Sequence, residues 1–531
     1  MAAQGENLVE RAIAKAIDAG RDGRVALCEG TRSLTYGEMA EKVRKTAAAL
    51  QAKGVKTGDR VAVYSPDCMD SALGVLGAMY AGAIALPISE LSAANDLRNR
   101  LNNATASIVL VHHTLRPVIE EVRTEVESLK ELITLSGEGD DDFGLLVETS
   151  DALTEPPVGG DDPALLLYSA SAANNENEVG SRGVLHSHAT AIRAFESFAG
   201  KFMSMTHEDR VFSTVRLSTA YGLGTGLLFP LLAGAQCLLV PEQPHSALVF
   251  EAIRDFKPTV FAATPSLYGQ MARDAVESPQ GKKPLSEVRW CLAGAESIPP
   301  KVIAMTRAVL GNNVTVGYGL TEAFQFVIAG AAAGRRQGFC GSVLDGIEVR
   351  IIDDEGKEVG VDEIGNLELR GKNVVNAYWG SDAAEMTEDG WFKTRDRFMV
   401  DEDKNFYHCG RVDQLFKVGG KWVAPAEVER ALLANEAVWE CAVIGADDED
   451  GLIKPFAFIV PNIGQVPGAE LEAELREYVK QELAPYKYPR WIEFIDELPK
   501  APSGVILRFK LMDRLKESIG RRHAEKRSDS D

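Results

Sequence analysis

The chain has 531 residues and a mass of 57.5 kDa, about three and a half times a ~150-residue domain, which excludes a single small module. Hydrophobic residues at 45%, charged residues at 25%, 48 glycines and 23 prolines exclude a collagen-like, disordered or coiled-coil chain. The 57 basic and 78 acidic residues leave a net charge of −21, which repels phosphate polymers and anionic lipid. Nucleic acid is therefore not expected as a partner.

The cysteines and the uncharged runs bear on location. Seven cysteines are scattered without a CxxC pair, which favours reduced thiols in a cytoplasm over disulfides or zinc. The N-terminal residues have no continuous apolar core typical of a secretory signal. Residues 71–89 and 217–241 are long enough to cross a bilayer, but their glycines and prolines favour buried helix-turn-strand segments. We expect a cytoplasmic protein with no membrane span.

Local patterns along the first 410 residues indicate alternating helices and strands. Thr35 and Glu38 form a capping box before an apolar helical face that includes Met39 and Val43. Residues 60–65 and 107–113 are short β-branched runs typical of buried parallel strands. Residues 136–163 are acidic and rich in glycine and proline, which predicts an exposed connection between subdomains.

The pattern of residues along the sequence changes near residue 410. A glycine-rich stretch leads to Pro425, which suits the first turn of a helix. Strand-like ECAVIGA and PFAFIVP follow, then a helix near 469–483, the strand WIEFI and a last basic helix. The fold class is therefore α/β, with a large N-terminal body of stacked sheet-and-helix subdomains (residues 1–410) and a small C-terminal α/β domain (residues 411–531).

Six short motifs occur in a fixed order, and the order is more specific than any one of them. They are SRGVLHSH at 181–188, AGAES at 293–297, GYGLTE at 317–322, GWFKTRD at 390–396, GRVDQLFKVGGKWVAPAEVE at 410–429 and LPKAPSGVILRFKL at 498–511. The set resembles the adenylate-forming superfamily of acyl-CoA synthetases, and AYGLGTG and LAPYKYPRWIEFIDELPK resemble its benzoate and aryl-CoA ligase branch. The resemblance implies the adenylate-forming enzyme fold, with a C-terminal domain that rotates on a hinge.

The same resemblance implies a two-step reaction. In this superfamily a carboxylate attacks the α-phosphate of ATP to give an acyl-adenylate, and the thiol of CoA then displaces AMP. The site must therefore hold phosphates, place a cation on the attacking carboxylate and admit a thiol.

The phosphate loop departs from the family pattern YSSGTTGxPKG. The matching residues 168–183 are five residues longer, lack the S/T-T-G turn and carry Glu176 and Glu178 where a triphosphate needs neutralisation. Arg182 takes the place of the family's lysine. The alternative is a lengthened surface loop whose charge is compensated by a salt bridge.

The family's PSGK motif, which supplies the adenylation lysine, reads PSGV at 502–505. Val505 carries no charge and donates no hydrogen bond, and losing one preorganised donor typically costs ~10²–10³ in rate. Lys500 and Lys510, each five positions away, are the candidates to replace the lysine. The catalytic residue is thus unknown.

A third departure lies at 394–396, where TRD replaces the family's TGD. Arg395 adds a long side chain at a position that suits glycine, so nucleotide affinity is in doubt. Asp396, which the family uses to hold the ribose, remains.

Other family residues are present. The resemblance assigns nucleotide or CoA binding to Arg182, Gly294, Glu296, Tyr318, Thr321, Glu322, Asp396 and Arg411, with magnesium on Glu322. It assigns the hinge to Asp413 and the pantetheine tunnel to Gly419, Gly420, Trp422 and Pro425. The half of the site that handles the thiol is therefore better preserved than the half that handles phosphate.

For the acyl pocket, Tyr221 with Gly222 and Gly224 resembles the aryl-binding segment of benzoate-type ligases. A plain packing tyrosine is nearly as compatible with the sequence. The histidines 186, 188, 207 and 245 are interpreted as structural rather than as bases. Cys291 and Cys409 have no adjacent base and are not favoured as nucleophiles.

The leading hypothesis is an acyltransferase that passes an aromatic acyl group from CoA to the phosphopantetheine thiol of an acyl carrier protein, with adenylation lost or crippled. Degenerate relatives of this kind are similar to the anthraniloyltransferases of aurachin-type quinolone biosynthesis, which implies an anthraniloyl group. The first alternative is an ATP- and Mg-dependent aryl-acid CoA ligase of the benzoate or anthranilate type, and the second is a non-catalytic binding protein. The expected partners are aryl-CoA and an acyl carrier protein, and a homodimer stays open.

Overall fold

The computed structural model describes residues 6–137, 142–169, 182–277, 283–294, 298–336, 338–375, 378–380, 386–419, 421–448, 451–500 and 506–515. The chain forms two compact units. Unit 1 comprises Met1–Arg335, Cys340–Val349 and Leu369–Lys393; unit 2 comprises Arg336–Phe339, Arg350–Glu368 and Thr394–Asp531. The domain boundary after residue 410 stays a prediction.

Unit 1 contains two sheets. The first has the order β6 (Glu131–Leu135), β5 (Ile108–His112), β3 (Arg60–Tyr64), β4 (Ile84–Ile88), β7 (Pro163–Ser169) and β8 (Arg182–Ser187). Its strands are parallel except at the β7–β8 edge. The predicted strands at 60–65 and 107–113 are confirmed as the buried parallel neighbours β3 and β5, in which Val61 faces Ile108.

The second sheet of unit 1 carries most of the candidate site. Its order is β2 (Arg32–Thr35), β1 (Val25–Glu29), β10 (Gln236–Leu238), β9 (Arg210–Ser213), β11 (Val260–Ala263), β12 (Trp290–Ala293), β13 (Val314–Gly319), β14 (Phe326–Ala331) and β15 (Phe339–Val343). The run from β1 to β13 is parallel, and β14 turns back antiparallel to β13. Carboxyl ends of parallel strands are where α/β proteins place ligands.

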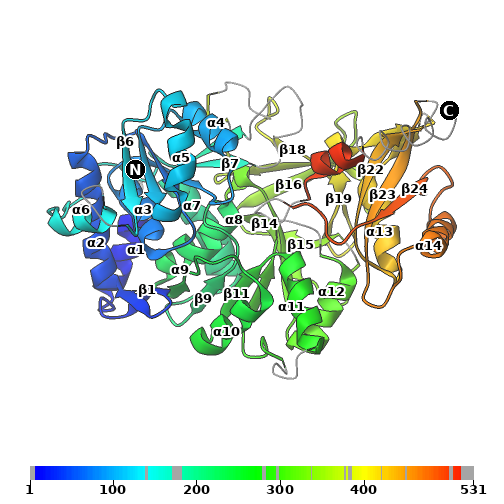
Figure 1. Cartoon of the computed structure of the whole chain (residues 1–531), viewed down its shortest axis with the longest axis horizontal. Coiled ribbons are helices and arrows are strands. Elements are labelled where there is room, and N and C mark those ends of the chain that lie inside the picture. The colour runs from blue at the N-terminus through cyan, green and yellow to red at the C-terminus, as the bar shows by residue number, and fades with distance from the viewer. Residues whose placement is uncertain are drawn as a thin grey trace, which may run out of the picture. The chain divides into compact units, whose positions relative to one another are not determined.

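Helices cover these sheets (Figure 1). They are α1 (Leu8–Asp18), α2 (Tyr36–Ala52), α3 (Met69–Tyr80), α4 (Ala94–Ala104), α5 (Arg116–Val122), α6 (Phe143–Thr149), α7 (His188–Ala194), α8 (Ala220–Leu223), α9 (Phe229–Ala233), α10 (Ser246–Phe256), α11 (Pro265–Glu277) and α12 (Pro300–Met305). The capping box is confirmed, because Glu38 N–H donates to the Thr35 hydroxyl while the Glu38 carboxylate accepts from Thr35 N–H. Short 3₁₀ or π turns span His113–Leu115, Arg123–Glu125, Phe195–Phe202, Gly224–Leu228, Thr306–Leu310 and Thr321–Ala323.

Two expectations for unit 1 have different outcomes. The uncharged runs are buried segments, α3 with β4 and α8 with α9 and β10, as predicted. The expectation that 136–163 is wholly an exposed connection is wrong, because α6 lies within it. Asp142 caps α6 by accepting from Leu145 N–H, and Phe143 and Val147 are buried one helical turn apart. Among the residues that the structure describes, every helix is too short or too polar to cross a bilayer.

Unit 2 combines a strand ladder with a small α/β layer. The ladder has the order β16 (Ile347–Ile352), β17 (Gly365–Gly371), β18 (Phe392–Val400) and β19 (Phe406–Arg411). The hairpin β20 (Phe416–Val418) and β21 (Lys421–Val423), α13 (Pro425–Ala434), β22 (Val438–Asp447), β23 (Ile453–Pro461), α14 (Ala469–Glu482) and β24 (Trp491–Phe494) follow. Pro425 begins α13 as predicted, and a further helical segment spans 508–515.

Candidate active site

Tyr221 lies on α8 at the edge of the buried core. Thr219 caps this short helix, since its hydroxyl accepts from Gly222 N–H at 3.0 Å and donates to the Arg216 carbonyl at 2.9 Å. A Cβ at Gly222 would lie 2.0 Å from the same carbonyl oxygen, so only glycine permits this tight turn. The predicted pocket segment is therefore locked in one conformation.

A buried glutamine that sequence reasoning missed braces the segment. Gln325 Nε2 donates to the Thr225 hydroxyl at 3.1 Å, and Gln325 Oε1 accepts from Phe326 N–H at 3.1 Å. A Cβ at Gly224 would lie 2.8 Å from Gln325 Nε2. Gly224 thus leaves room for this polar brace, which a side chain at position 224 would displace.

The carboxyl end of β12 meets the Tyr221 ring, since a Cβ at Gly294 would lie 3.3 Å from Tyr221 Cε1. Ala293 faces Val316 in the parallel register, so Gly294 and Gly317, which follow them, lie side by side. The ring of Phe326 covers both glycines, and its centroid is 4.9 Å from that of Tyr221. Sequence reasoning missed Phe326; the aromatic residues directly after the GYGLTE motif were the available signal.

The polar atoms of this cluster are almost fully buried. The Tyr221 hydroxyl has no hydrogen-bond partner among the described residues, and burial raises its pKa. Tyr221 therefore stays protonated and can donate a hydrogen bond.

Glu322 is held by a tyrosine that lies outside the six sequence motifs. The Glu322 side chain is 2% exposed, and its Oε1 accepts from the Tyr378 hydroxyl at 2.9 Å. The Arg182 guanidinium lies over the Tyr378 ring at 5.1 Å. The structure thus brings Arg182 and Glu322 to the same tyrosine, which sequence reasoning did not find.

Tyr318 and Thr321 lie beside this group. Tyr318 is half-buried on β13 opposite Ile328, and Thr321 opens the turn that carries Glu322. The predicted nucleotide-binding residues 318, 321 and 322 therefore share one short segment at the carboxyl end of β13.

Magnesium chemistry was assigned to Glu322. Among the described residues no three His, Cys, Asp or Glu side chains gather to hold a metal ion. Mg²⁺ is usually bound by one or two carboxylates together with substrate phosphates. One carboxylate at Glu322 fits a Mg²⁺ ion that arrives with a nucleotide.

The histidines behave as structural residues. His188 Nδ1 accepts from Leu8 N–H at 3.2 Å, and the His245 side chain caps α10. His186 is fully buried against Phe324, and burial lowers its pKa to about 4, which the nearby Thr321 backbone offsets only in part. A neutral, enclosed imidazole is not placed to act as a base.

The two cysteines weighed as nucleophiles are buried thiols. Burial raises the pKa of Cys291 to about 12 and also raises that of Cys409. Few thiolates exist at neutral pH under these conditions, so neither cysteine is favoured for acyl transfer.

In unit 2, Asp396 lies on β18 and is 7% exposed. Its Oδ1 lies 3.1 Å from His408 Nε2 and 3.5 Å from a guanidinium nitrogen of Arg411. The two predicted ribose contacts, Asp396 and Arg411, are therefore neighbours, and His408 was missed. Arg395, directly before Asp396, is exposed with φ of +62°, a backbone conformation that favours glycine.

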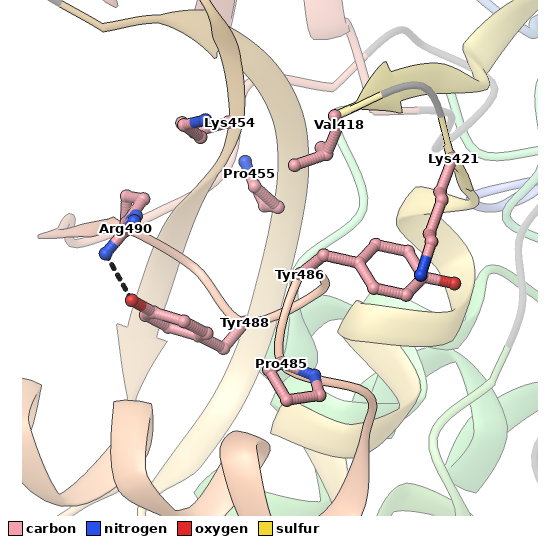
Figure 2. A pocket seen from close by; sticks show the side chains of 9 residues that line it. Val418, Lys421, Lys454, Pro455, Pro485, Tyr486, Tyr488 and Arg490 are labelled. Atoms are coloured by element: carbon pink, nitrogen blue, oxygen red, sulfur yellow. Dashed lines mark hydrogen bonds between the residues drawn. The ribbon is translucent and has the colours of Figure 1, made fainter.

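The predicted hinge and tunnel residues lie on consecutive elements of unit 2. Asp413 is in the turn Val412–Gln414, Gly419 has φ of +55° at the tip of the β20–β21 hairpin, and Trp422 is on β21. Gly419 lines a pocket of about 340 Å³ (Figure 2). The other lining residues are Val418, Lys421, Lys454, Pro455, Pro485, Tyr486, Tyr488 and Arg490.

Several predicted residues lie outside the described residues: Glu296, Gly420, Val505 and the phosphate loop at 170–181.

One candidate replacement for the missing lysine is already engaged, because Lys500 Nζ donates to both carboxylate oxygens of Glu440 at 2.9 and 3.0 Å. Recruiting Lys500 would mean breaking this ion pair. Lys510 is exposed.

Comparison with known proteins decides the family. The AMP-binding enzyme family matches residues 14–379, and the AMP-binding enzyme C-terminal domain matches residues 427–504. The chain belongs to the AMP-binding enzymes. It is 34% identical over 510 residues to a benzoate–CoA ligase of Thauera aromatica, covering 95% of both chains. It is 33% identical to a 4-hydroxybenzoate–CoA/benzoate–CoA ligase of Rhodopseudomonas palustris, covering 96% of this chain and 93% of that protein.

Solved AMP-binding enzymes share the fold. An anthranilate CoA ligase in complex with anthranoyl-AMP superposes with a TM-score of 0.87 at 30% identity, covering 96% of this chain and 97% of the other. A benzoate CoA ligase from Burkholderia xenovorans gives 0.86 at 30% identity, covering 95% and 99%. The adenylate-forming fold is thus confirmed, and this chain is an enzyme of the acyl-CoA synthetase superfamily. These relatives support the aryl-acid CoA ligase, the alternative of the sequence analysis, better than the carrier-protein acyltransferase.

Proposed function

We propose that this AMP-binding enzyme forms or exchanges aryl thioesters of CoA. The observation that carries the proposal is the buried cluster in which Tyr221 and Phe326 lie against Gly294 at a strand end. Aromatic side chains at a strand end provide the apolar surface that a flat aromatic acyl group would contact.

The reaction that the relatives favour is ATP-dependent ligation of an aromatic acid to CoA. The acid's carboxylate would attack the α-phosphate of ATP, releasing pyrophosphate, and the CoA thiol would then displace AMP from the acyl-adenylate. Glu322 would hold the Mg²⁺ that neutralises the phosphates, and Asp396 with Arg411 would hold the ribose. Tyr378 would keep the Glu322 carboxylate in place through its hydroxyl.

A second candidate is favoured by this chain's own sequence. Val505 stands where the family has its adenylation lysine, the phosphate loop carries two glutamates, and Lys500 is committed to Glu440. Exchange of an acyl group between two thiols needs no ATP and is nearly isoenergetic. The thiolate of carrier-protein phosphopantetheine would attack the acyl carbon, and the CoA thiolate would leave and take up a proton. An anthraniloyl group, a carrier-protein partner, a homodimer and a cytoplasmic location stay predictions.

CoA recognition is common to both candidates. Lys421, Lys454 and Arg490 line the pocket beside Gly419 in a chain whose net charge is −21. Figure 2 shows Tyr486 beside Lys421, whose Nζ lies 5.0 Å from the ring centroid, and Arg490 hydrogen-bonded to the Tyr488 hydroxyl. Cations next to aromatic rings suit the phosphates and adenine of CoA. Replacing Lys421 and Arg490 by alanine should raise KM for CoA thioesters without weakening binding of the aryl acid.

One pair of assays separates the two reactions. Purified enzyme is incubated with benzoate or anthranilate, ATP and Mg²⁺, and acid-dependent pyrophosphate exchange is measured. It is then given the preformed aryl-CoA with holo carrier protein, and the acylated carrier is sought by mass. Exchange without transfer identifies the ligase, and transfer without exchange identifies the acyltransferase. If the enzyme shows no exchange and no transfer, the proposal is contradicted.

Val505→Lys sharpens this test. We expect it to restore little adenylation, since the loop residues that act with the lysine are also altered and such effects are not additive. Full recovery from this one substitution would mean that the loop is competent.

A further inference from the structure

Main-chain pairing holds Tyr378 beside the start of strand β8. An isolated antiparallel bridge joins Val184 to Tyr378, and Trp379 N–H donates to the Gly183 carbonyl at 2.7 Å. Arg182, the first residue of β8, directly precedes this paired stretch. Tyr378 therefore lies next to the strand that carries Arg182, although the two residues are far apart in the sequence.

The residues just before Tyr378 are bonded to the turn that carries Glu322. Val375 N–H donates to the Glu322 carbonyl at 2.8 Å, and Asn373 Nδ2 donates to the Ala323 carbonyl at 3.2 Å. The Tyr378 hydroxyl donates to Glu322 Oε1 at 2.9 Å. These hydrogen bonds fix both the main chain of the turn and the carboxylate of Glu322.

The Tyr378 ring faces the side chain of Arg182. The guanidinium carbon lies 5.1 Å from the ring centroid, within the range of a cation–π interaction, and Tyr378 is 9% exposed. A planar guanidinium stacks on an aromatic face, whereas a lysine ammonium is a hydrated point charge that gains less from the same ring. The arginine at the position of the family's lysine therefore has a partner that suits an arginine.

We propose that Tyr378 is a positioning residue that places the Arg182 guanidinium with its ring and the Glu322 carboxylate with its hydroxyl, so that both act on one polyphosphate. The guanidinium would contact phosphate oxygens, and the carboxylate would hold Mg²⁺ beside them. This inference rests on the proposed function in its ligase form, because it concerns the same nucleotide site. It implies that arginine at position 182 is matched to Tyr378 and cannot be exchanged for the family's lysine.

The test measures the affinities for Mg–ATP, AMP and benzoate by calorimetry. Arg182→Lys restores the family's residue, but we expect it to weaken Mg–ATP binding about fivefold, because the ammonium loses the stacking contact. Tyr378→Leu should weaken Mg–ATP binding by at least as much. Neither variant should change the affinity for AMP or benzoate by more than about twofold, whereas a brace that served folding alone would not discriminate ATP from AMP.

Double variants separate the ring from the hydroxyl. Tyr378→Phe keeps the ring, so Arg182→Lys should still weaken Mg–ATP binding about fivefold in that background. Tyr378→Leu has no ring, so adding Arg182→Lys there should change the affinity by less than about twofold.

Unit 2 offers a matched control. Tyr407 is 6% exposed, its hydroxyl donates to Asp401 Oδ2 at 3.0 Å, and the Arg336 guanidinium lies 4.1 Å from its ring centroid. Tyr407→Leu thus removes the same kind of ring between an arginine and a carboxylate. It should leave Mg–ATP binding unchanged.

The outcomes separate this inference from the proposed function. Unchanged or tighter Mg–ATP binding by Arg182→Lys overturns the inference, and so does an equal loss of AMP affinity in variants whose melting temperature shows them to be folded. A wild type that binds no Mg–ATP but transfers aryl groups from CoA also overturns it, while the proposed function stands. A wild type that shows neither exchange nor transfer contradicts the proposed function, and the Mg–ATP affinities of the variants still decide the inference.

Discussion

The buried segments around Tyr221 in unit 1 and the strand segment around Asp396 in unit 2 differ in how they use glycine. In unit 1, Gly222 and Gly317 lie outside the left-handed region of backbone space, but other atoms lie so close that a Cβ has no room. In unit 2, Arg395 adopts φ of +62° with its side chain exposed. Close approach in a core excludes every side chain, whereas an exposed left-handed residue costs only about 1–2 kcal/mol. The chain has therefore kept glycine where packing demands it and lost it where strain can be tolerated.

The largest effect is expected at Gly222. A Cβ there would lie 2.0 Å from the Arg216 carbonyl oxygen and 2.4 Å from that of Val215, and a shift of the Arg216 carbonyl would break its hydrogen bond from the Thr219 hydroxyl. Gly222→Ala should cost about 3 kcal/mol or more, measured by denaturant unfolding. Gly23→Ala is the control, since nothing lies within 4 Å of its Cβ position. Equal stability of the two variants would contradict the packing argument.

The next largest effect is expected at Glu322, and it tests whether the enzyme adenylates its substrate. If the enzyme adenylates, Glu322→Gln should lower pyrophosphate exchange ~10²–10³-fold, because the carboxylate that holds Mg²⁺ is lost. Tyr378→Phe keeps the carboxylate and removes only its hydrogen bond at Oε1, so a loss of about tenfold is expected. In an acyltransferase, Glu322→Gln should change aryl transfer less than about threefold. Exchange that survives Glu322→Gln unchanged would remove Glu322 from the nucleotide site.

Sequence reasoning found what local patterns encode. The helix at Tyr36–Ala52 follows from a capping box and an apolar face, and β3 and β5 follow from β-branched runs. The ordered motifs identified Tyr318, Glu322 and Arg411, which lie at strand ends or on a short turn, and Asp396, which lies in the middle of β18.

The missed residues act through contacts between segments far apart in the chain. Tyr378 meets Glu322, and Phe326 meets Gly294, without any shared periodicity or motif. The helix Phe143–Thr149 was missed because its acidic, glycine-rich flanks dominate the composition of the segment. Long-range packing, rather than local propensity, therefore decided the contacts of Tyr378 and Phe326.

A moderate effect is expected from pH at the segment that carries Tyr221. Arg216 lies 2.9 Å from Glu90 and 3.7 Å from Asp67, whose carboxylate also accepts from Leu217 N–H at 3.1 Å. Burial raises the pKa of Asp67 to about 7, outweighing the attraction of Arg216, and the Glu90 charge adds to the rise. The folded state thus binds a proton that the unfolded chain releases near pH 4.

The raised pKa of Asp67 makes the free energy of unfolding depend on pH. The stability that Asp67 contributes is fully present below pH ~4 and is lost as pH rises through about 7, by up to ~1.4 kcal/mol per pH unit. Denaturation midpoints at pH 5, 6, 7 and 8 should therefore fall more steeply with pH in wild type than in Asp67→Asn. Parallel pH profiles of the two proteins would show that Asp67 ionises normally.

The smallest effect is expected at Arg395. Arg395→Gly should gain about 0.5–1 kcal/mol of unfolding free energy, because relief of the left-handed strain exceeds the extra entropy of an unfolded glycine. Lys404→Gly is the matched control for strain alone, because Lys404 also lies in unit 2 and has φ of +59°. Both variants should be stabilised, but only Arg395→Gly, which removes a long side chain next to Asp396, should tighten AMP binding in calorimetry. Equal AMP affinity in the two variants would mean that the arginine does not obstruct the proposed ribose site.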